Sequence, residues 1–558
     1  MFLSFSKTDI RTMVKISDVL EQRQSDSSPC VAHVSNHRSI TKVLTYRDAW
    51  LVLKEHQSWL ERLLPPLSED TVIAYLSSNS TDMMISLLAA ANQKAKVALL
   101  NTRWTSSEMA AVLQSATGST IILYSNELRG KAFETKTKLQ HAAVLVEIPY
   151  LADPYLTESW STSSHEESPT NESIDKQIQT ASTAPSSDDD ALLVFTSGTT
   201  SGSKGVRLSH RALLVQALAK LRDPCRYNRT TRMLSTTVPL FHVGGLSSTL
   251  AVWLAGGTLM APAADGIKSG FDPSIVLDMI SHPHVPTNTL VVVPAMLHAL
   301  IQIVQQREQV VYPQAELILI GGQSASQDMI DNLGKIFPRA RLVQTYACTE
   351  AASSMTFHEP TIFLPEPPIA GDCVGLPPPH VQLQLVERTD STTIITEPYT
   401  VGILATSGPH VMTGYWKRNC SSTKNQQQPK SCFVTNDLGF RDLQGLFYFC
   451  GRSKDVIRTG GETVIALEVE RVLLQHDSID ECAVFGLPDV KFGETVCAAI
   501  VSSRQLSLDN IRQHHCHGLA SYKRPRRLFA MSELPRNSSG KVLKFQLVQQ
   551  FQTPISKL

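Results

Sequence analysis

A loop of small residues near the middle of the chain follows directly from an apolar run and is closed by a lysine. The apolar run is 192–195 (LLVF), the loop is 196–203, and Lys204 ends it. Residues 206–208 (VRL) then have the pattern of a returning strand. Glycines let backbone N–H groups approach a ligand, hydroxyls donate hydrogen bonds, and lysine adds positive charge. The pattern predicts a strand–loop–strand unit that binds a polyphosphate, with a flexible surface hairpin as the alternative.

Apolar strand-like runs alternate with helical patterns along much of the chain. Residues 71–76 (TVIAYL), 84–92 and 96–100 show this alternation, which resumes after Leu192. Such alternation favours parallel α/β layers. Between about 370 and 450 the apolar runs shorten and turn residues multiply, which indicates an antiparallel β subdomain. We therefore predict an α/β fold. The loop is not a Walker A loop, because G-x-x-x-x-G-K-[ST] does not fit it.

The length of 558 residues is too great for a single hydrophobic core. The glycine-rich, charged segment 451–461 has the composition of a hinge. We expect a large N-terminal domain, 1–450, made of two parallel α/β subdomains and a β subdomain, and a small mobile α+β C-terminal domain, 451–558. Residues 158–190 are rich in Ser, Thr, Asp and Glu and are predicted to form a flexible insertion, because they cannot bury enough apolar surface. The polar segment 421–431 has the same character.

Charge and composition exclude several classes of protein. Lys+Arg and Asp+Glu are both 51, so the basic excess of a nucleic-acid binder is absent and a small-molecule partner is expected. No apolar run reaches the roughly 18 or more residues needed to span a bilayer. The ten cysteines include no C-x-x-C pair, which is typical of reduced thiols in an intracellular protein. The cluster 514–517 (HHCH) lacks a second ligand pair at zinc spacing.

Further motifs follow the loop in a fixed order. They are 239–245 (PLFHVGG), 321–324 (GGQS), 346–350 (YACTE), 435–437 (TND), 451–455 (GRSKD), 459–462 (TGGE) and 539–541 (SGK). With the loop, these segments resemble the adenylate-forming superfamily, which includes acyl-CoA synthetases, luciferases and peptide-synthetase adenylation domains. The resemblance implies an enzyme that uses ATP and Mg²⁺ to convert a carboxylic acid into an acyl-adenylate and then transfers the acyl group to coenzyme A.

The resemblance assigns nucleotide-binding roles to single residues. Glu350 would hold Mg²⁺ against the ATP phosphates, and Asp437 would accept hydrogen bonds from both ribose hydroxyls. Tyr346 would form the adenine wall and Arg452 a further nucleotide contact. Without the motifs, Glu350 would be interpreted as a surface acid, Tyr346 as a core aromatic and Arg452 as an exposed charge. The full expected cofactor-binding set is Thr196, Ser197, Gly198, Thr199, Thr200, Gly321, Gly322, Gln323, Tyr346, Thr349, Asp437, Arg452, Gly460 and Gly461.

Three basic residues, Lys541, His242 and Lys204, are expected to take part in the chemistry. By resemblance, Lys541 bridges the substrate carboxylate and the α-phosphate, where its charge would stabilise the joining of two anions. His242 would gate the acyl pocket, although a satisfied core histidine fits the residue type as well. Lys454 lies at the hinge position, about which the C-terminal domain would swing so that Gly460 and Gly461 line the pantetheine path.

The sequence departs from the usual family motifs at three places. Residues 201–203 replace the usual Gly-x-Pro before Lys204, Asn436 replaces a common Gly before Asp437, and Thr463 replaces a common Asn. Each change is sterically mild. We expect them to affect rate and loop rigidity more than the type of reaction.

Several segments outside the catalytic motifs resemble plant-type 2-succinylbenzoate–CoA ligases of phylloquinone and menaquinone biosynthesis. These segments include 293–296, 336–341, 373–375 and 379–380. The resemblance implies that the succinyl carboxylate is activated while polar groups hold the aromatic carboxylate. Ser247, Ser248 and Thr249 are candidates for lining that pocket, or are small residues that pack a helix.

Other acids and other classes stay open on the sequence alone. A peroxisomal fatty-acyl or 4-coumarate-like CoA ligase is the alternative within the same reaction type. A carrier-protein-loading adenylation module and a luciferase-like oxygenase are alternatives of a different class. The ending Ser556-Lys557-Leu558 matches the peroxisomal address read by an import receptor, so a peroxisome is expected, with a plastid as the alternative location.

Overall fold

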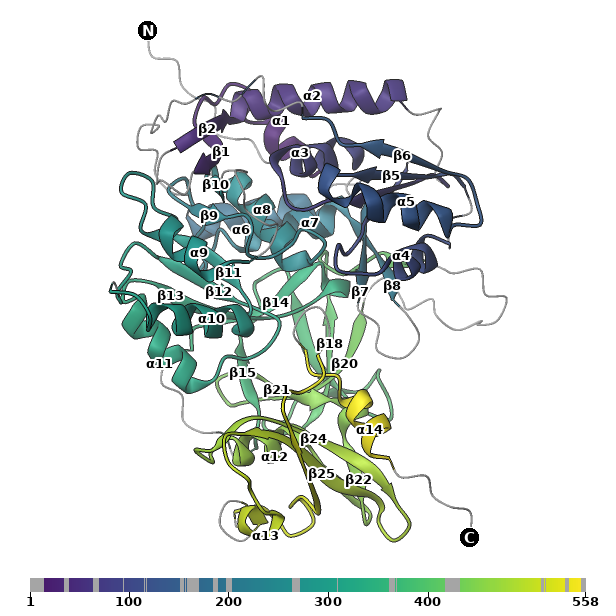
Figure 1. Ribbon diagram of the computed structural model, residues 1–558, viewed down its shortest axis with the longest axis vertical. Coiled ribbons are helices and arrows are strands. Elements are labelled where there is room, and N and C mark those ends of the chain that lie inside the picture. Colours follow the sequence, from purple (N-terminus) through teal and green to yellow (C-terminus); the bar gives the residue numbers. More distant parts are fainter. Residues whose placement is uncertain are drawn as a thin grey trace.

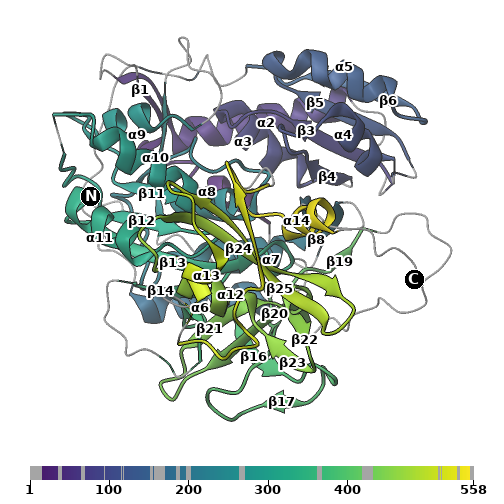
Figure 2. The same cartoon turned by 60° about the horizontal axis from the view of Figure 1, so that its bottom comes forward.

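The computed structural model shows four β-sheets, three before residue 453 and one after it (Figures 1 and 2). It describes residues 15–34, 40–63, 70–93, 95–114, 116, 118–150, 155, 157, 170–183, 189–196, 203–262, 271–308, 310–360, 367, 369–416, 432–512, 516, 518–536 and 541–552. In Figure 1 the C-terminal elements, coloured green to yellow, lie at the opposite end of the molecule from the N-terminal helices, which are purple.

Two large and mostly parallel sheets form the N-terminal part, which confirms the predicted α/β class. The first has the order β14-β13-β12-β11-β9-β10-β1-β2 and the second β19-β8-β7-β4-β3-β5-β6. The strands of the first sheet are β1 (Pro29–Val34), β2 (Ile40–Thr45), β9 (Arg232–Leu234), β10 (Thr258–Pro262), β11 (Thr289–Val292), β12 (Leu317–Ile320), β13 (Arg341–Cys348) and β14 (Ser353–His358). Those of the second are β3 (Val72–Leu76), β4 (Lys96–Leu99), β5 (Thr120–Tyr124), β6 (Ala143–Glu147), β7 (Asp190–Thr196), β8 (Lys204–Ser209) and β19 (Gly414–Tyr415). Every residue of β3 is buried, as expected for a parallel strand covered on both faces.

Helices cover these sheets and connect their strands. They are α1 (Asp18–Glu21), α2 (Tyr46–Leu63), α3 (Thr81–Ala90), α4 (Ser106–Leu113), α5 (Arg129–Thr137), α6 (Asn171–Thr183), α7 (His210–Ala219), α8 (Val243–Ala255), α9 (Pro273–Ile280), α10 (Pro294–Val304) and α11 (Gln327–Ile336), with the short 3-10 turns η2 (Asn126–Leu128) and η5 (Thr349–Ala351). Helix α8 is capped by Gly256, the residue after its end, whose φ of 77° is left-handed and therefore favours glycine. Within the described ranges, every helix is too short or too polar to cross a bilayer.

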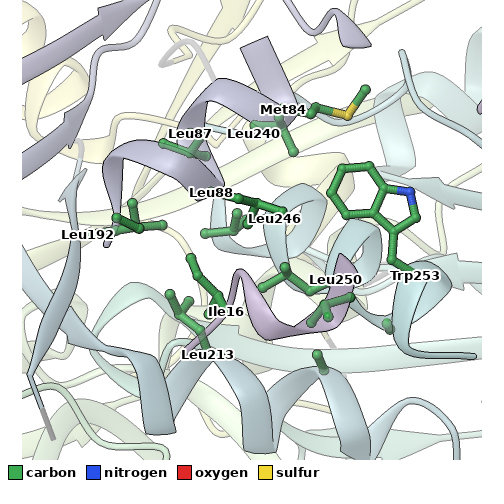
Figure 3. Close-up of a cluster of buried hydrophobic side chains, with 14 of the residues drawn as sticks. Ile16, Met84, Leu87, Leu88, Leu192, Leu213, Leu240, Leu246, Leu250 and Trp253 are labelled. Carbon is green, nitrogen blue, oxygen red and sulfur yellow. The ribbon is translucent and has the colours of Figure 1, made fainter. Parts of the chain in front are cut away.

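A hydrophobic core between the two large sheets fixes the positions of α3, α7 and α8. Figure 3 shows Leu88 of α3, Leu213 of α7, and Leu246 and Leu250 of α8 pointing toward one another, and all four are at most 2% exposed. Burial of a leucine side chain stabilises a fold by about 1.5–3 kcal/mol relative to exposure. Helices α7 and α8 are therefore rigid supports for the residues at their ends.

The other two sheets correspond to the predicted β subdomain and C-terminal unit. The six-stranded antiparallel sheet has the order β15-β21-β20-β18-β16-β17. Its strands are β15 (Asp372–Gly375), β16 (Gln382–Val386), β17 (Ile394–Ile395), β18 (Gly402–Ser407), β20 (Phe433–Arg441) and β21 (Phe447–Arg452). After the turn η6 (Ser453–Asp455) come β22 (Ile457–Thr459), β23 (Glu462–Val464), α12 (Ala466–Leu473), β24 (Ile479–Asp489), β25 (Gly493–Ser502), α13 (Leu508–Asn510), β26 (Arg527–Met531) and α14 (Lys544–Phe551).

The structure differs from the predicted flexible insertion at 158–190. Residues 171–183 form α6, in which Ile174, Ile178 and Ala181 are buried. Their spacing of four and three residues places them on one helical face, and α6 packs against α7. Burial of these three apolar side chains offsets the entropy cost of ordering the segment. Residues 158–169, 184–188 and 421–431 lie outside the described residues.

Candidate active site

The predicted site residues gather where parallel strands of the first large sheet end. Gly321 follows β12, Tyr346 lies near the end of β13, and Thr349 and Glu350 lie in η5 directly after β13. Loops at the carboxyl ends of parallel strands are the usual place for ligands in α/β sheets. His242 is the residue before α8, and strands of the β subdomain bring further side chains to the same edge.

Tyr346, Asp437 and Arg452 form one contact group that joins the first large sheet to the β subdomain. The Tyr346 hydroxyl donates to Asp437 Oδ2 at 2.8 Å, and Arg452 Nε lies 3.5 Å from Asp437 Oδ1. Asp437 and Arg452 are cross-strand partners in β20 and β21. Burial raises the pKa of Asp437, although Arg452, the Tyr346 hydroxyl and Lys541 act in the opposite direction. A carboxylate that is oriented and only partly neutralised is suited to accept hydrogen bonds from ribose hydroxyls.

Asn436 adopts the left-handed conformation that the residue before Asp437 requires. Its φ is 63°, in a region that glycine and asparagine tolerate better than other residues. The replacement of glycine at this position therefore keeps the backbone geometry. Asp437 N–H donates to Thr435 Oγ1 at 3.1 Å, which fixes the backbone of this turn.

Glu350 is oriented by Tyr415, a residue that the sequence analysis did not select. The Tyr415 hydroxyl donates to Glu350 Oε1 at 2.8 Å, and Lys204 Nζ lies 5.1 Å from the centre of the Tyr415 ring. Strand β19, which contains Tyr415, pairs with β8, whose first residue is Lys204. Tyr415 therefore connects the predicted metal-binding carboxylate to the predicted phosphate-binding lysine. The sequence offers no local signal for this contact, because 65 residues separate Tyr415 from Glu350.

His242 is neutral in this environment. Burial lowers the pKa of His242 to about 4, and the charges of Arg103 and Lys541 act in the same direction. The His242 ring lies 4.7 Å from the Phe241 ring, measured between centroids. A neutral imidazole at the start of α8 can approach an anionic substrate as a donor or acceptor without adding a full charge.

Lys541 lies in the same cleft although it belongs to the C-terminal part of the chain. Burial and Arg452 lower the pKa of Lys541, whereas Asp437, Cys348 and Glu350 act to raise it. All four of these neighbours belong to β13, η5, β20 or β21. Lys541 is also among the charges that act on His242. The structure therefore brings Lys541, Asp437, Glu350 and His242 together in one arrangement.

Of the two glycines after β12, Gly322 has a positive φ and is exposed. Gly321 N–H donates to Val292 O at 3.0 Å, and Gly322 has a φ of 86°. Gly322 and Gln323 are exposed at the edge of the sheet. A flat ligand such as a purine could approach this backbone closely.

Of the other predicted residues, one lies beside Lys204, four lie outside the described part of the chain, and two lie in the C-terminal sheet. Thr196 ends β7 and is the strand partner of Lys204, but Ser197, Gly198, Thr199 and Thr200 lie outside the described residues. Gly460 and Gly461 form the two-residue turn between β22 and β23, with φ of 60° and 84°, as a type I′ turn requires. Gly460 N–H donates to Phe492 O at 2.8 Å, so this turn packs on the β24–β25 hairpin.

The pocket candidates next to His242 are buried in helix α8. Ser247 and Ser248 are both 0% exposed and Thr249 is 5% exposed. Ser247 contacts Lys220 and Ser353, neither of which the sequence analysis selected. Long-range contacts of this kind have no signature in local periodicity.

The comparison with known protein families agrees with the geometry of the cleft. A family model described as AMP-binding enzyme matches residues 22–416. The chain belongs to the AMP-binding enzyme family. A second family model, described as the AMP-binding enzyme C-terminal domain, matches residues 468–541, the part that carries Lys541.

Relatives of this AMP-binding enzyme include several CoA ligases. The chloroplastic/peroxisomal 2-succinylbenzoate–CoA ligase of Arabidopsis thaliana is 34% identical over 414 residues, which are 68% of this chain and 71% of that protein. A 2-succinylbenzoate–CoA ligase of Bacillus cereus is 29% identical over 64% of this chain and 69% of its own. The oxalate–CoA ligase of Arabidopsis thaliana is 29% identical over 86% of this chain and 88% of its own. The enzyme is an AMP-forming acyl-CoA synthetase.

Solved structures share the fold over nearly the whole chain. The o-succinylbenzoate coenzyme A synthetase of Bacillus subtilis, in complex with ATP and magnesium, matches with a TM-score of 0.73 and 25% identity and covers 95% of this chain and 98% of its own. ATP-bound MatB from Rhodopseudomonas palustris matches with a TM-score of 0.75 and 21% identity and covers 96% of this chain and 99% of its own.

The donor set at Glu350 fits a magnesium ion held jointly by the protein and a substrate phosphate. Mg²⁺ is usually bound by one or two carboxylates together with phosphate oxygens and water. Tyr415 orients Glu350 through Oε1, which leaves Oε2 for a cation. Among the described residues, no group of three or more His, Cys, Asp or Glu side chains could hold a metal ion by itself, as expected where phosphates supply ligands.

Proposed function

We propose that this enzyme is a 2-succinylbenzoate–CoA ligase that forms an acyl-adenylate from the acid and ATP and then a thioester with coenzyme A. The adenylation step is supported by one observation above all, the presence of Lys541 beside Asp437 and Glu350 in the cleft. The choice of acid is supported by the 34% identity to the Arabidopsis ligase over 68% of the chain.

In the first step, a substrate carboxylate oxygen attacks the α-phosphorus of ATP, a P–O bond forms, and the bond to the leaving pyrophosphate breaks. Asp437 orients the ribose, and the backbone at Gly321 and Gly322 receives the adenine. Lys541 lies where the two anions meet, so its ammonium stabilises the charge that develops on the α-phosphate. Lys204 adds positive charge on the side of the leaving phosphates. Neutral His242 borders the acid without repelling or trapping its carboxylate.

Mg²⁺, when bound at Glu350, would neutralise phosphate charge and favour departure of pyrophosphate. Glu350 would be its protein ligand, with Thr349 beside it, and Tyr415 keeps the carboxylate in position.

In the second step, the thiol sulfur of coenzyme A attacks the acyl carbonyl carbon, the bond between that carbon and the AMP oxygen breaks, and the thiol proton is released. Lys541 has no role in this step. We propose that the C-terminal part turns about Lys454 in η6, which removes Lys541 from the cleft and brings the Gly460-Gly461 turn to the acyl group. Because both glycines lack a side chain, a pantetheine arm can pass close to their backbone.

The acid is tested by following pyrophosphate release with 2-succinylbenzoate, oxalate, 4-coumarate and palmitate, each with and without coenzyme A. We expect 2-succinylbenzoate to give the highest kcat/KM and to form its thioester when coenzyme A is present. Turnover of another acid with none of 2-succinylbenzoate would refute the choice of substrate. Pyrophosphate release with no thioester product would refute the thiol acceptor.

We further propose a peroxisomal location, read from Ser556-Lys557-Leu558 by an import receptor. The Arabidopsis relative is chloroplastic/peroxisomal, so a plastid is the alternative. A fluorescent protein fused at the N-terminus, with and without these three residues, tests this in cells. Peroxisomal import of the truncated fusion would contradict the role of this ending.

A further inference from the structure

Asn79 joins the two large sheets at the carboxyl ends of their strands. It lies in the short connection between β3 and α3 and is partly buried. The Asn79 Nδ2 amide donates to Ser235 O at 2.7 Å and to Val238 O at 3.1 Å. Asn79 Oδ1 accepts from Leu240 N–H at 3.0 Å. One side chain of the second sheet therefore binds three backbone groups of the segment that follows β9 in the first sheet.

The segment that Asn79 holds leads directly into His242. It begins at Ser235, the residue after β9, and ends at Leu240. The His242 N–H donates to Pro239 O at 3.0 Å, so the turn before α8 is built on the same stretch of backbone. Helix α8 starts at the residue after His242. The position of the His242 side chain therefore depends on where this segment lies.

Helix α8 and the core enclose the segment from the other side. A Cβ atom at Gly245 would lie 2.6 Å from Val238 O and 2.7 Å from Pro239 O, so these carbonyl groups lie close against the first turn of α8. Leu240 is 2% exposed and belongs to the core shown in Figure 3. Without the Asn79 amide, the segment would be held from one side only.

An asparagine amide matches the three backbone groups in a way that a carboxylate does not. The amide offers two N–H donors and one carbonyl acceptor, and the segment presents two carbonyls and one N–H to it. An ionised aspartate only accepts hydrogen bonds. It would keep the contact with Leu240 N–H but would face the carbonyls of Ser235 and Val238 without a donor. Because both N–H groups of Asn79 are engaged within the protein, its amide acts on the backbone and not on a substrate.

We propose that Asn79 is a positioning residue, which fixes His242 at the acid through segment 235–240. The inference rests on the proposed function, in which neutral His242 borders the substrate carboxylate. The residues assigned to the nucleotide come from β12, β13, η5, β20 and β21 or follow them directly, whereas the contacts of Asn79 reach the segment after β9. Asn79 therefore governs how the acid is placed for attack, and ATP binding does not depend on it.

The test is a double-mutant cycle between Asn79→Asp and His242→Ala, with the acid that the wild-type enzyme converts best. The readouts are kcat/KM for that acid and KM for ATP, both from pyrophosphate release. Because a displacement of about 1 Å can cost about 100-fold in rate, we expect Asn79→Asp to lower kcat/KM for the acid by roughly 10- to 100-fold. The KM for ATP should stay unchanged. In the His242→Ala background, Asn79→Asp should cause little further loss, because residues that act through one another are not additive.

Asn92→Asp is the matched control, because Asn92 lies just beyond the other end of α3 and its amide donates to Ser17 Oγ at 2.8 Å. This variant should leave both readouts unchanged. If thermal melting shows that Asn79→Asp does not fold, Asn79→Ser takes its place in the cycle, since it removes the amide without adding a charge.

Three results overturn the inference and leave the proposed function intact. They are an unchanged kcat/KM for the acid in the folded Asn79 variant or in His242→Ala, losses that multiply in the double variant, and a rise in the KM for ATP as large as the loss for the acid. Multiplying losses would mean that Asn79 only stabilises the junction of the sheets. A wild-type enzyme that activates no acid removes the proposed function and this inference together.

Discussion

Removal of the Lys541 side chain should separate the two half-reactions. Lys541 lies near Asp437, Glu350 and Cys348 in the structure, which is the arrangement that we propose for adenylation. If the C-terminal part turns before thioester formation, the Lys541 ammonium has no task in the second step. The variant Lys541→Ala should therefore lose adenylation and keep the transfer of a preformed acyl-adenylate to coenzyme A.

The expected size of the loss follows from the partly buried position of Lys541. Two unit charges about 4 Å apart interact by about 4 kcal/mol at an effective dielectric constant of about 20, which suits a group between the surface and the interior. Because about 1.4 kcal/mol of activation free energy changes a rate tenfold, Lys541→Ala should lower the rate of adenylation by roughly 10³-fold. Burial already lowers the pKa of Lys541, so this ammonium is poorly hydrated and its charge is weakly screened.

Two assays on the same protein measure this separation. Exchange of labelled pyrophosphate into ATP reports adenylation, and release of AMP from supplied 2-succinylbenzoyl-adenylate and coenzyme A reports the transfer. Lys544→Ala is the control, since Lys544 lies three residues further on and pairs with Glu470 within the C-terminal part at 2.7 Å. Equal losses of both half-reactions in Lys541→Ala, with Lys544→Ala fully active, would refute the reasoning.

Two further changes test the site and the fold. Tyr415→Phe removes the hydroxyl that donates to Glu350 Oε1 but keeps the ring beside Lys204. The Mg²⁺ concentration for half-maximal pyrophosphate exchange should therefore rise about 10- to 100-fold. An unchanged Mg²⁺ dependence would show that this hydroxyl does not orient a metal ligand. Burial lowers the pKa of His210 to about 4, and its Nδ1 accepts from Ile16 N–H at 3.1 Å. The unfolded chain binds a proton at His210 more tightly than the folded protein does. The contribution of neutral His210 to the free energy of unfolding is therefore fully present above about pH 6.5, and about 3 kcal/mol of it is lost as the pH falls toward 4. Urea unfolding at pH 7.5 and 4.5 should show a smaller loss for His210→Asn than for the wild-type protein, and equal losses would contradict the assignment.

Local sequence patterns predicted the architecture because strands, helices and motif loops are each encoded within short segments. The run 192–195 and the return at 206–208 correspond to β7 and β8, which pair in antiparallel fashion. Helix α6 was missed because its mean composition is polar, and only the spacing of Ile174, Ile178 and Ala181 carries the helical signal.

The side-chain contacts of the site could not be predicted in the same way. Tyr415 and Glu350 are 65 residues apart, and Lys220 and Ser353 are 133 residues apart. Neither pair has a characteristic spacing, because each contact arises where two separate elements pack. The motif resemblance indicated Tyr346 and Asp437 as nucleotide ligands. The hydrogen bond between them could not be predicted, because it depends on how β13 and β20 lie relative to each other in the fold.

One polar contact between the two parts of the chain is of a kind that is easily broken. Arg471 of α12 donates to Gly371 O at 2.8 Å and pairs with Asp372 of β15, and the Arg471 side chain is 40% exposed. An exposed ion pair of this kind stabilises by about 1 kcal/mol or less. In the proposed mechanism, Lys541 stabilises the closed arrangement most strongly while the α-phosphate carries developing charge, and this extra charge is gone once pyrophosphate has left. We infer that departure of Lys541 after this step lets one cleft serve the adenylation and the thioester step in turn, and that the Arg471–Asp372 pair is one of the contacts that must break.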